Sequence, residues 1–261
     1  MVFLNKEKVV ILCGGKGTRL REETEFKPKP LVEIGGLPIL WHIMKIYSYY
    51  GYNDFILCLG YKGRMIKQFF MEYEWENFDF TMNLKSRNKK WYRNYEVEDW
   101  NITFADTGDD TLTGGRVKKI EKYIEDDNFM LTYGDGVGDI NIQKLSEFHK
   151  KLGKIATLTG IHPLTKYGLI KINHGFEVLD FQEKPKMEDL INAGFMVLKS
   201  DFFNYIKSDC MFESKVLPKL SKTKQVALYT HTGFWGCMDN YKDFVDLNRM
   251  WKNNPKWKIW K

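Results

Sequence analysis

One stretch near the start of the chain, residues 9–38, constrains the fold more than any other. It opens with Val-Val-Ile-Leu at residues 9–12, a pattern typical of a short buried strand. Three glycines follow within four positions, at Gly14, Gly15 and Gly17. Glycine has no Cβ, so such a turn brings the backbone close to a ligand and presents several N–H groups to it. The stretch therefore predicts a strand followed by a phosphate-binding loop.

Cationic side chains come soon after this loop. Arg19 carries a fork of donors that matches a phosphate. Lys27 and Lys29 alternate with two prolines, which stiffen the backbone that carries the ammonium groups. We interpret the loop and these cations as a clamp for a polyphosphate. The alternative is a tight turn followed by a solvated basic loop, because neither the G-x-G-x-x-G nor the Walker spacing is present.

Composition limits the partners that this chain can have. It has 261 residues, 43% of them hydrophobic and 28% charged, as in a globular protein, and its net charge is +6. That modest excess fits an anionic small molecule, and no run of like charges calls for a nucleic-acid partner. The four cysteines are far apart, and no apolar run reaches the ~18 residues of a membrane span. We expect a cytoplasmic protein without nucleic-acid or membrane partners, and a homo-oligomer whose interface uses C-terminal aromatic residues.

Strand and helix patterns alternate through the first half of the chain. Helical periodicity over residues 39–50 follows the first strand. A second apolar strand, residues 55–59, precedes a second helix at about residues 64–73. Two consecutive strand–helix units make up most of a nucleotide-binding half. The predicted fold class is α/β, with a Rossmann-like, mixed but mostly parallel sheet flanked by helices.

The second half of the chain predicts an extension of the same sheet. A helix is expected at residues 117–124 and a buried strand at residues 129–133. From residue 155, strands follow one another closely, among them residues 169–172 and 176–181, which we expect to extend the sheet in a mixed or antiparallel way. Because no linker or internal repeat interrupts the pattern, we expect a single domain over residues 1–261.

Two aspartates occupy positions that suit a metal ion. Asp135 lies just past the strand 129–133, between two glycines, where ligands of open α/β sheets bind. Mg²⁺ prefers one or two protein carboxylates together with phosphate oxygens and water. The alternative is a turn aspartate that binds its own backbone. Asp239 also follows a strand and precedes a helix, and taken alone it is better explained as an N-cap.

Four further residues could contact the substrate. Glu183 and Lys184 follow the strand 176–181 and could hold hydroxyl groups and a phosphate, or form an exposed ion pair of little energetic value. Arg116 follows two glycines at the expected start of a helix, which suits an anion. Thr111 could contact a base or phosphate, or cap a turn.

Several motifs together resemble those of the sugar nucleotidyltransferases, and within them the glucose-1-phosphate cytidylyltransferases. They are GGKGTRL, KPKPLVEIGG, DTGDDTLTGGR, TYGDGVGDI, FQEKPK, NAGFMVL and GFWGCMD, and the resemblance extends from about residue 9 to residue 260. It implies a nucleotide-diphospho-sugar transferase fold, a need for Mg²⁺, and transfer of CMP from CTP to α-D-glucose 1-phosphate. Alternatives are a pyrimidine nucleotidyltransferase for another sugar 1-phosphate, a non-catalytic sugar-nucleotide-binding homologue, or a glycosyltransferase.

The resemblance also implies roles for individual residues. Those implied in catalysis are Arg19, Lys29, Asp135 and Lys184, while Asp135 and Asp239 would share Mg²⁺. The nucleotide would contact Leu12, Cys13, Gly14, Gly15, Lys16, Gly17, Thr18, Arg19, Thr111, Arg116 and Gly134. The sugar phosphate would contact Lys29, Gly168, Glu183, Lys184 and Asn192.

The loop at residues 106–116 favours cytosine over uracil or thymine, because it lacks the Gln- and Pro-containing pattern of thymidylyl relatives. Cytosine carries an amino group at C4 where the other two bases carry a carbonyl. We expect backbone carbonyls near the glycine-rich loop to accept from that amino group, with Leu12, Gly14 or Gly15 as candidates.

Overall fold

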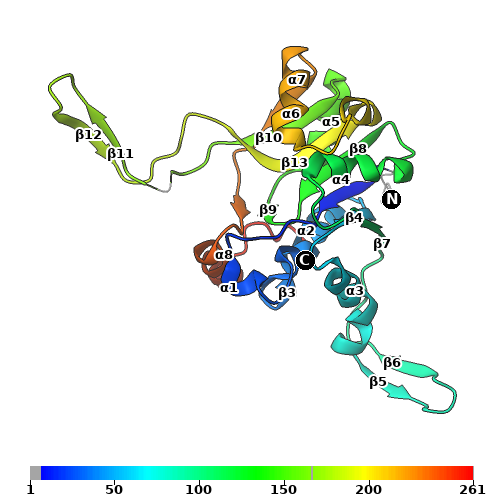
Figure 1. Cartoon of the computed structure of the whole chain (residues 1–261). Coiled ribbons are helices and arrows are strands. Elements are labelled where there is room, and N and C mark those ends of the chain that lie inside the picture. Colours follow the sequence, from blue (N-terminus) through cyan, green and yellow to red (C-terminus); the bar gives the residue numbers. More distant parts are fainter. Residues whose placement is uncertain (1–6, 166, 261) are drawn as a thin grey trace.

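A mixed seven-stranded sheet forms the centre of the molecule in the computed structural model, which describes residues 7–165 and 167–260 (Figure 1). The strand order is β14 (Val226–Thr230), β10 (Ala156–Ile161), β13 (Ile191–Lys199), β8 (Asn128–Tyr133), β1 (Val9–Leu12), β4 (Asp54–Leu59) and β7 (Asn101–Asp106). Strands β8, β1, β4 and β7 are parallel, β13 is antiparallel to both of its neighbours, and β14 is parallel to β10. The predicted α/β fold class is therefore confirmed.

Helices cover both faces of this sheet and bury alternate residues of its central strand. Val9 and Ile11 belong to a core shared with α2 (Ile39–Tyr49), α3 (Gly63–Asn77) and α5 (Ile142–Leu152). Val10 and Leu12 belong to a second core, shared with α4 (Thr113–Lys119), α6 (Phe212–Lys215) and α7 (Leu217–Lys222). Burial on both faces explains why the strand is apolar at every position.

The C-terminal aromatic residues pack inside the chain. Asn240 and Asp243 form a capping box at the start of α8 (Tyr241–Asn253), and Leu247 of this helix is buried. Trp257 is fully buried, with its ring 5.7 Å from that of Phe234 and 6.1 Å from that of Trp251. Our assignment of the C-terminal aromatic residues to a subunit interface is therefore wrong for Trp257, which completes the core of its own chain.

Two ribbons project from the body (Figure 1). The first pairs β5 (Asp79–Met82) with β6 (Lys89–Tyr92) in antiparallel fashion. The second pairs β11 (Leu169–Ile172) with β12 (Val178–Gln182), two strands that we expected to extend the central sheet. They form a separate two-stranded sheet instead, because their apolar side chains stay exposed and do not enter either core.

Helix α4 begins four residues earlier than expected, at Thr113, and ends at Lys119, before the short 3₁₀ helix η2 (Glu121–Tyr123). It contains Gly114 and Gly115, which are poor helix formers. A Cβ atom would lie 2.7 Å from the carbonyl oxygen of Cys210 at the first glycine, and 2.1 Å from Asp209 Oδ1 at the second. The glycines therefore allow close packing, and this tertiary contact outweighs helix propensity.

The remaining elements are short. They are α1 (Arg21–Thr24), η1 (Lys29–Leu31), the pair β2 (Glu33–Ile34) and β3 (Leu37–Pro38), the pair β9 (Gly136–Gly138) and β15 (Trp235–Cys237), and η3 (Ser200–Tyr205). Within residues 7–165 and 167–260, no helix has the length and apolar character needed to cross a bilayer.

Candidate active site

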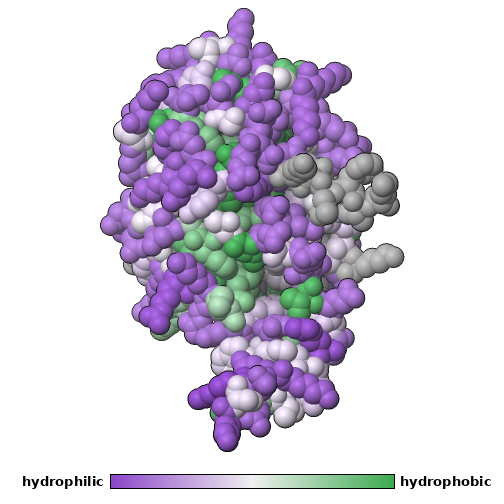
Figure 2. Space-filling view, turned by 90° about the vertical axis from the view of Figure 1, so that its right-hand side faces the viewer, coloured by the Kyte–Doolittle hydropathy of each residue, from purple (hydrophilic) through white to green (hydrophobic). Residues whose placement is uncertain are grey.

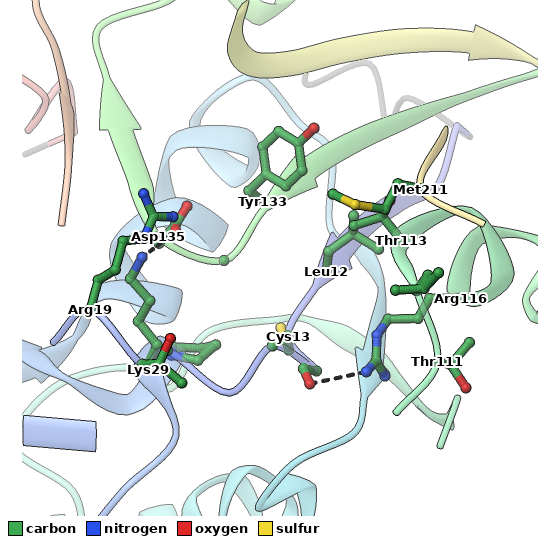
Figure 3. Close-up of a pocket in the computed structure, with 17 residues that line it drawn as sticks. Leu12, Cys13, Arg19, Lys29, Thr111, Thr113, Arg116, Tyr133, Asp135 and Met211 are labelled. Carbon is green, nitrogen blue, oxygen red and sulfur yellow. Dashed lines mark hydrogen bonds and ion pairs between the residues drawn. The ribbon is translucent and has the colours of Figure 1, made fainter. Parts of the chain in front are cut away.

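A cavity of about 370 Å³ opens beyond the carboxyl ends of β1 and β8, which lie side by side with Leu12 opposite Tyr133 (Figure 3). This is where parallel α/β sheets bind their ligands. Of the residues predicted to form the site, those that line the cavity are Leu12, Cys13, Gly14, Gly15, Gly17, Thr18, Arg19, Lys29, Thr111, Arg116, Gly134 and Asp135.

The glycine-rich loop follows β1 directly and is stabilised by hydrogen bonds from the side chain of Thr24. Gly17 has a φ of +62°, a conformation that favours glycine. The buried Thr24 hydroxyl hydrogen bonds to the carbonyl oxygens of Gly17, at 3.0 Å, and of Leu20, at 2.7 Å. These contacts fix the turn and leave Gly15 and Thr18 exposed beside the cavity.

Lys29 connects the two aspartates predicted as metal ligands. Its Nζ lies 2.6 Å from Asp135 Oδ2 and 3.0 Å from Asp239 Oδ1, and Arg19 forms an ion pair with the second oxygen of Asp239. The Lys29 side chain is 11% exposed and that of Arg19 is 76% exposed. Burial disfavours the charge of Lys29, but Asp135, Cys237 and Asp239 together outweigh it and raise the pKa of this lysine. The ammonium group therefore stays charged in the site.

Strand pairing brings the two aspartates together. The antiparallel pair of β9 and β15 places Cys237 opposite Gly136, and the backbone N–H of Met238 donates to the carbonyl oxygen of Asp135 at 2.9 Å. The N-cap of α8 is Asn240. Interpreting Asp239 as an N-cap is therefore wrong, and its carboxylate is available to the site.

The carboxylates of Asp135 and Asp239 fit a divalent cation. One ligand atom from each of these residues and the sulfur of Cys237 lie within 4.8 Å of one another. Burial raises the pKa of the Cys237 thiol to about 12, so without a metal this sulfur is protonated and a weak ligand. Two carboxylates beside the glycine-rich loop match the preference of Mg²⁺ for oxygen ligands.

Arg116 is buried and holds the backbone around the cavity. Its two terminal nitrogens donate to five oxygens, the carbonyls of Gly14, Leu59, Gly108 and Asp109 and the hydroxyl of Thr107, at 2.7–3.1 Å. A Cβ atom at Gly14 would lie 2.1 Å from Arg116 Nη1, so a glycine is needed there. We expected Arg116 to bind an anion, but in this structure its terminal nitrogens are directed to the protein. It ties the glycine-rich loop to residues 107–109.

Comparison with known proteins identifies the family. The model of the nucleotidyl transferase family matches residues 8–254. The chain belongs to this family. It is 46% identical over 256 residues to the probable glucose-1-phosphate cytidylyltransferase of Bacillus subtilis (strain 168), covering 97% of this chain and all of that protein. It is also 46% identical to the glucose-1-phosphate cytidylyltransferase of Salmonella typhimurium, covering 97% of this chain and 99% of that protein.

Solved structures share the nucleotidyl transferase fold. HddC from Yersinia pseudotuberculosis, crystallised with GMP-PN, superposes with a TM-score of 0.68 at 24% identity. The alignment covers 93% of this chain and 98% of that one. At this level of identity the likeness shows the fold alone.

Several residues predicted for this nucleotidyl transferase do not reach the cavity in the structure. Glu183 and Lys184 follow β12 on the projecting ribbon and pair with each other at 2.9 Å, and both side chains are more than half exposed. Gly168 directly precedes β11 on the same ribbon, and Asn192 in β13 accepts from the backbone N–H of Gly194 at 3.0 Å. Two further predicted residues lie outside the cavity lining: Lys16, which pairs with Asp110 at 2.8 Å, and Asp239, which pairs with Lys29 at 3.0 Å.

Other residues that line the cavity were missed from the sequence. They are Pro30, Leu112, Thr113, Tyr133 and Met211. Tyr133 could have been predicted from the sequence, because it is the last residue of a strand whose carboxyl end faces the ligand. Nothing local singles out Met211, which reaches the cavity because the segment before α6 packs against α4.

Proposed function

We propose that this nucleotidyl transferase transfers CMP from CTP to α-D-glucose 1-phosphate, giving CDP-glucose and pyrophosphate. The observation that carries the proposal is one cavity lined by the glycine-rich loop, Lys29 and Asp135, with the Asp239 carboxylate paired to the same lysine. This arrangement suits a triphosphate with a divalent cation. The names of the two relatives that are 46% identical support the choice of CTP and glucose 1-phosphate.

A divalent metal ion is general in this family, and we propose Mg²⁺ held by Asp135 and Asp239. The ion would supply charge neutralisation at the phosphate oxygens. Lys29 lies between the same carboxylates, so metal and triphosphate would bind where this ammonium group now sits. Lys29 and the exposed Arg19 are then free to turn toward the phosphates.

The chemistry needs no general base from the protein. A sugar 1-phosphate is already ionised at pH 7, so one of its oxygens can attack the α-phosphorus of CTP directly. The new P–O bond forms as the bond from the α-phosphorus to the bridging oxygen of the β-phosphate breaks, and pyrophosphate leaves. Catalysis then consists of positioning and charge stabilisation by Lys29 and Arg19.

We also propose that Gly168, Glu183, Lys184 and Asn192 bind the sugar phosphate. The ribbon that carries Glu183 and Lys184 must reach a cavity for this, either by changing its position or from a second copy of the chain. We propose a homo-oligomer, supported by the exposed apolar side chains of β11 and β12. A site that uses CTP also favours the cytoplasm, where nucleoside triphosphates are made.

A substrate panel tests the proposed function. Pyrophosphate release would be measured with each of CTP, UTP, dTTP and GTP against glucose, galactose and mannose 1-phosphates, with Mg²⁺ and with excess chelator. We expect the highest kcat/KM for CTP with glucose 1-phosphate and no turnover without divalent metal. A higher value for another nucleotide or sugar, or no turnover with any pair, would overturn the proposal.

A further inference from the structure

Glu213, a residue of α6 that does not line the cavity, hydrogen bonds to the hydroxyl groups of two residues that do. Thr113 Oγ1 lies 2.5 Å from Glu213 Oε2, and the Tyr133 hydroxyl lies 2.8 Å from Glu213 Oε1. The two residues come from different elements, Thr113 from α4 and Tyr133 from β8 (Figure 3). The Glu213 carboxylate therefore orients the hydroxyl groups of two residues that line the cavity.

The direction of these hydrogen bonds is set by chemistry. An ionised carboxylate can only accept hydrogen bonds, so each of the two hydroxyl groups donates its single hydrogen bond to Glu213. Thr113 Oγ1 also accepts from the backbone N–H of Phe212 at 3.2 Å. Burial and the Glu213 carboxylate raise the pKa of Tyr133 well above its ordinary value, so this hydroxyl keeps its proton. Toward a ligand, both hydroxyls can only accept.

Thr113 lies at the end of the cavity away from Arg19 and Lys29, and Tyr133 lies between the two ends (Figure 3). Figure 3 shows Arg19, Lys29 and Asp135 at one end and Thr113 and Met211 toward the other. Phosphate oxygens are acceptors and would gain nothing from Thr113 and Tyr133. The group that meets these hydroxyls must be a donor, which in a nucleotide is an amino group of the base or a hydroxyl of the sugar.

The backbone carbonyls that we expected to read the base are largely engaged. The carbonyl oxygen of Leu12 accepts from the N–H of Gly134 at 3.1 Å. That of Gly14 accepts from Arg116 at 3.0 Å and from the N–H of Tyr61 at 3.3 Å. The two side-chain hydroxyls are the better acceptors for an additional donor.

We propose that Glu213 is a positioning residue for base selection, which holds Thr113 and Tyr133 as acceptors for the 4-amino group of cytosine. Uracil and thymine would present a carbonyl oxygen to the same acceptors and would leave buried polar groups unpaired. The inference rests on the proposed function, because it concerns how the same cavity distinguishes CTP from UTP.

The test compares CTP and UTP as substrates of the unaltered chain and of Glu213→Gln. A glutamine amide can donate, so it releases the hydroxyl protons to point at the ligand. We expect the ratio of kcat/KM for CTP to that for UTP to fall by roughly tenfold, the order expected for one mismatched polar contact. The matched control is Glu125→Gln, at an exposed glutamate, which should leave the ratio unchanged.

A double-mutant series separates positioning from simple structural support. Tyr133→Phe and Thr113→Val should each lower the CTP to UTP ratio, and Glu213→Gln should add little to the ratio in a variant that carries both. If Glu213→Gln does not fold, as judged by urea unfolding, these two single variants carry the test. An equal loss for CTP and UTP, with the ratio unchanged, would overturn the inference, since it would place the hydroxyls against the ribose or in a structural role.

The two proposals fail differently. If the unaltered chain releases no pyrophosphate from CTP and glucose 1-phosphate, the proposed function fails. Calorimetric titration with CTP and with UTP then still tests the inference, because base preference is a property of binding. Equal affinity of the unaltered chain for both nucleotides would overturn it, and a preference for CTP that Glu213→Gln removes would support it.

Discussion

At the scale of single residues, burial separates side chains that look alike in the sequence. Lys27 and Lys29 stand two positions apart in the same motif. Lys27 pairs with Glu33 at the surface, at 2.8 Å, whereas Lys29 is nearly buried between Asp135 and Asp239. A surface pair contributes little to stability or function, but an ammonium group inside the site interacts strongly with phosphate charge.

We therefore predict different outcomes for the same substitution at these two lysines. Lys29→Met should lower kcat/KM for CTP by at least about 100-fold, the usual order for removal of one strong electrostatic contact. Lys27→Met should change it less than about threefold, since its charge is screened by solvent. Steady-state pyrophosphate release measures both. Similar losses in the two variants would show that the buried position of Lys29 has no special role.

Arg116 gives a second prediction at this scale. Lysine cannot reproduce a planar fork that serves five oxygens, so Arg116→Lys should leave several carbonyls unpaired. We expect a loss of about 2–3 kcal/mol in the free energy of unfolding, together with a higher KM for CTP. Urea unfolding measures the loss, and Arg19→Lys, at an exposed arginine, should leave stability unchanged. A stable Arg116→Lys variant with reduced CTP affinity would instead favour direct contact with the nucleotide.

At the scale of elements, the C-terminal segment is joined to α2 through a neutral histidine. His42 Nε2 donates to the carbonyl oxygen of Ile34 at 2.9 Å, and its Nδ1 accepts from Trp257 Nε1 at 3.4 Å. Both ring nitrogens are thus used by the uncharged form. Burial lowers the pKa of His42 to about 4, so this histidine resists protonation while the chain is folded.

The depressed pKa makes stability depend on pH in a defined window. In the unfolded chain His42 takes up a proton near pH 6.5, while in the folded chain it does so only near pH 4. The unfolded state therefore binds more protons between these values, and stability should fall as the pH is lowered from about 6.5 to 4, by up to about 3 kcal/mol for this residue. His149 is depressed to about 4 as well, mainly by burial, and adds to the loss.

Urea unfolding at pH 7 and pH 5 checks this prediction. His42→Gln should be less stable at pH 7 but should lose less stability between the two pH values than the unaltered chain. His174→Gln, at an exposed histidine on the ribbon turn, should lose as much as the unaltered chain. An unchanged pH dependence in His42→Gln would mean that this histidine does not titrate as the structure requires.

At the scale of the whole molecule, the body and the ribbons differ in how far their apolar side chains are buried. The body buries them in two cores. On the face over the edge strand β7, an apolar strip runs through the polar surface above the β5–β6 ribbon (Figure 2). On the β11–β12 ribbon, the side chains of Ile170, Val178 and Phe181 are 59–62% exposed. A two-stranded ribbon of this kind is marginally stable alone, so we expect another chain to cover it.

Association can be tested on this ribbon. Ile170→Lys places a charge among the apolar side chains of β11 and should shift the chain toward monomer in sedimentation velocity, while the fold of the body, followed by circular dichroism, stays intact. Gln143→Lys adds the same charge at an exposed position of α5 and should leave the oligomer unchanged. A monomeric unaltered chain would contradict the proposal of a homo-oligomer.

The sequence by itself determined the features that depend on neighbouring residues. The apolar run Val9–Leu12 forms β1 with the expected bounds, and the glycines after it form the loop at the cavity. The helix predicted at residues 39–50 and the strand predicted at residues 55–59 likewise form, as Ile39–Tyr49 and Asp54–Leu59, since periodicity and flanking turns act over a few residues. The local motifs were also enough to indicate a phosphate site.

Only the tertiary structure decided which distant groups meet. Lys29 and Asp239 are 210 positions apart, and they touch because β9 pairs with β15. Packing of α6 against α4 likewise brings Glu213 to the cavity wall, whereas Lys184 lies on a ribbon outside the cavity despite its motif. Strand register and helix packing depend on the shape of two complete cores, and no local spacing encodes that shape. Spacing can therefore nominate a charged residue, but burial and pairing across the fold decide whether it enters the site.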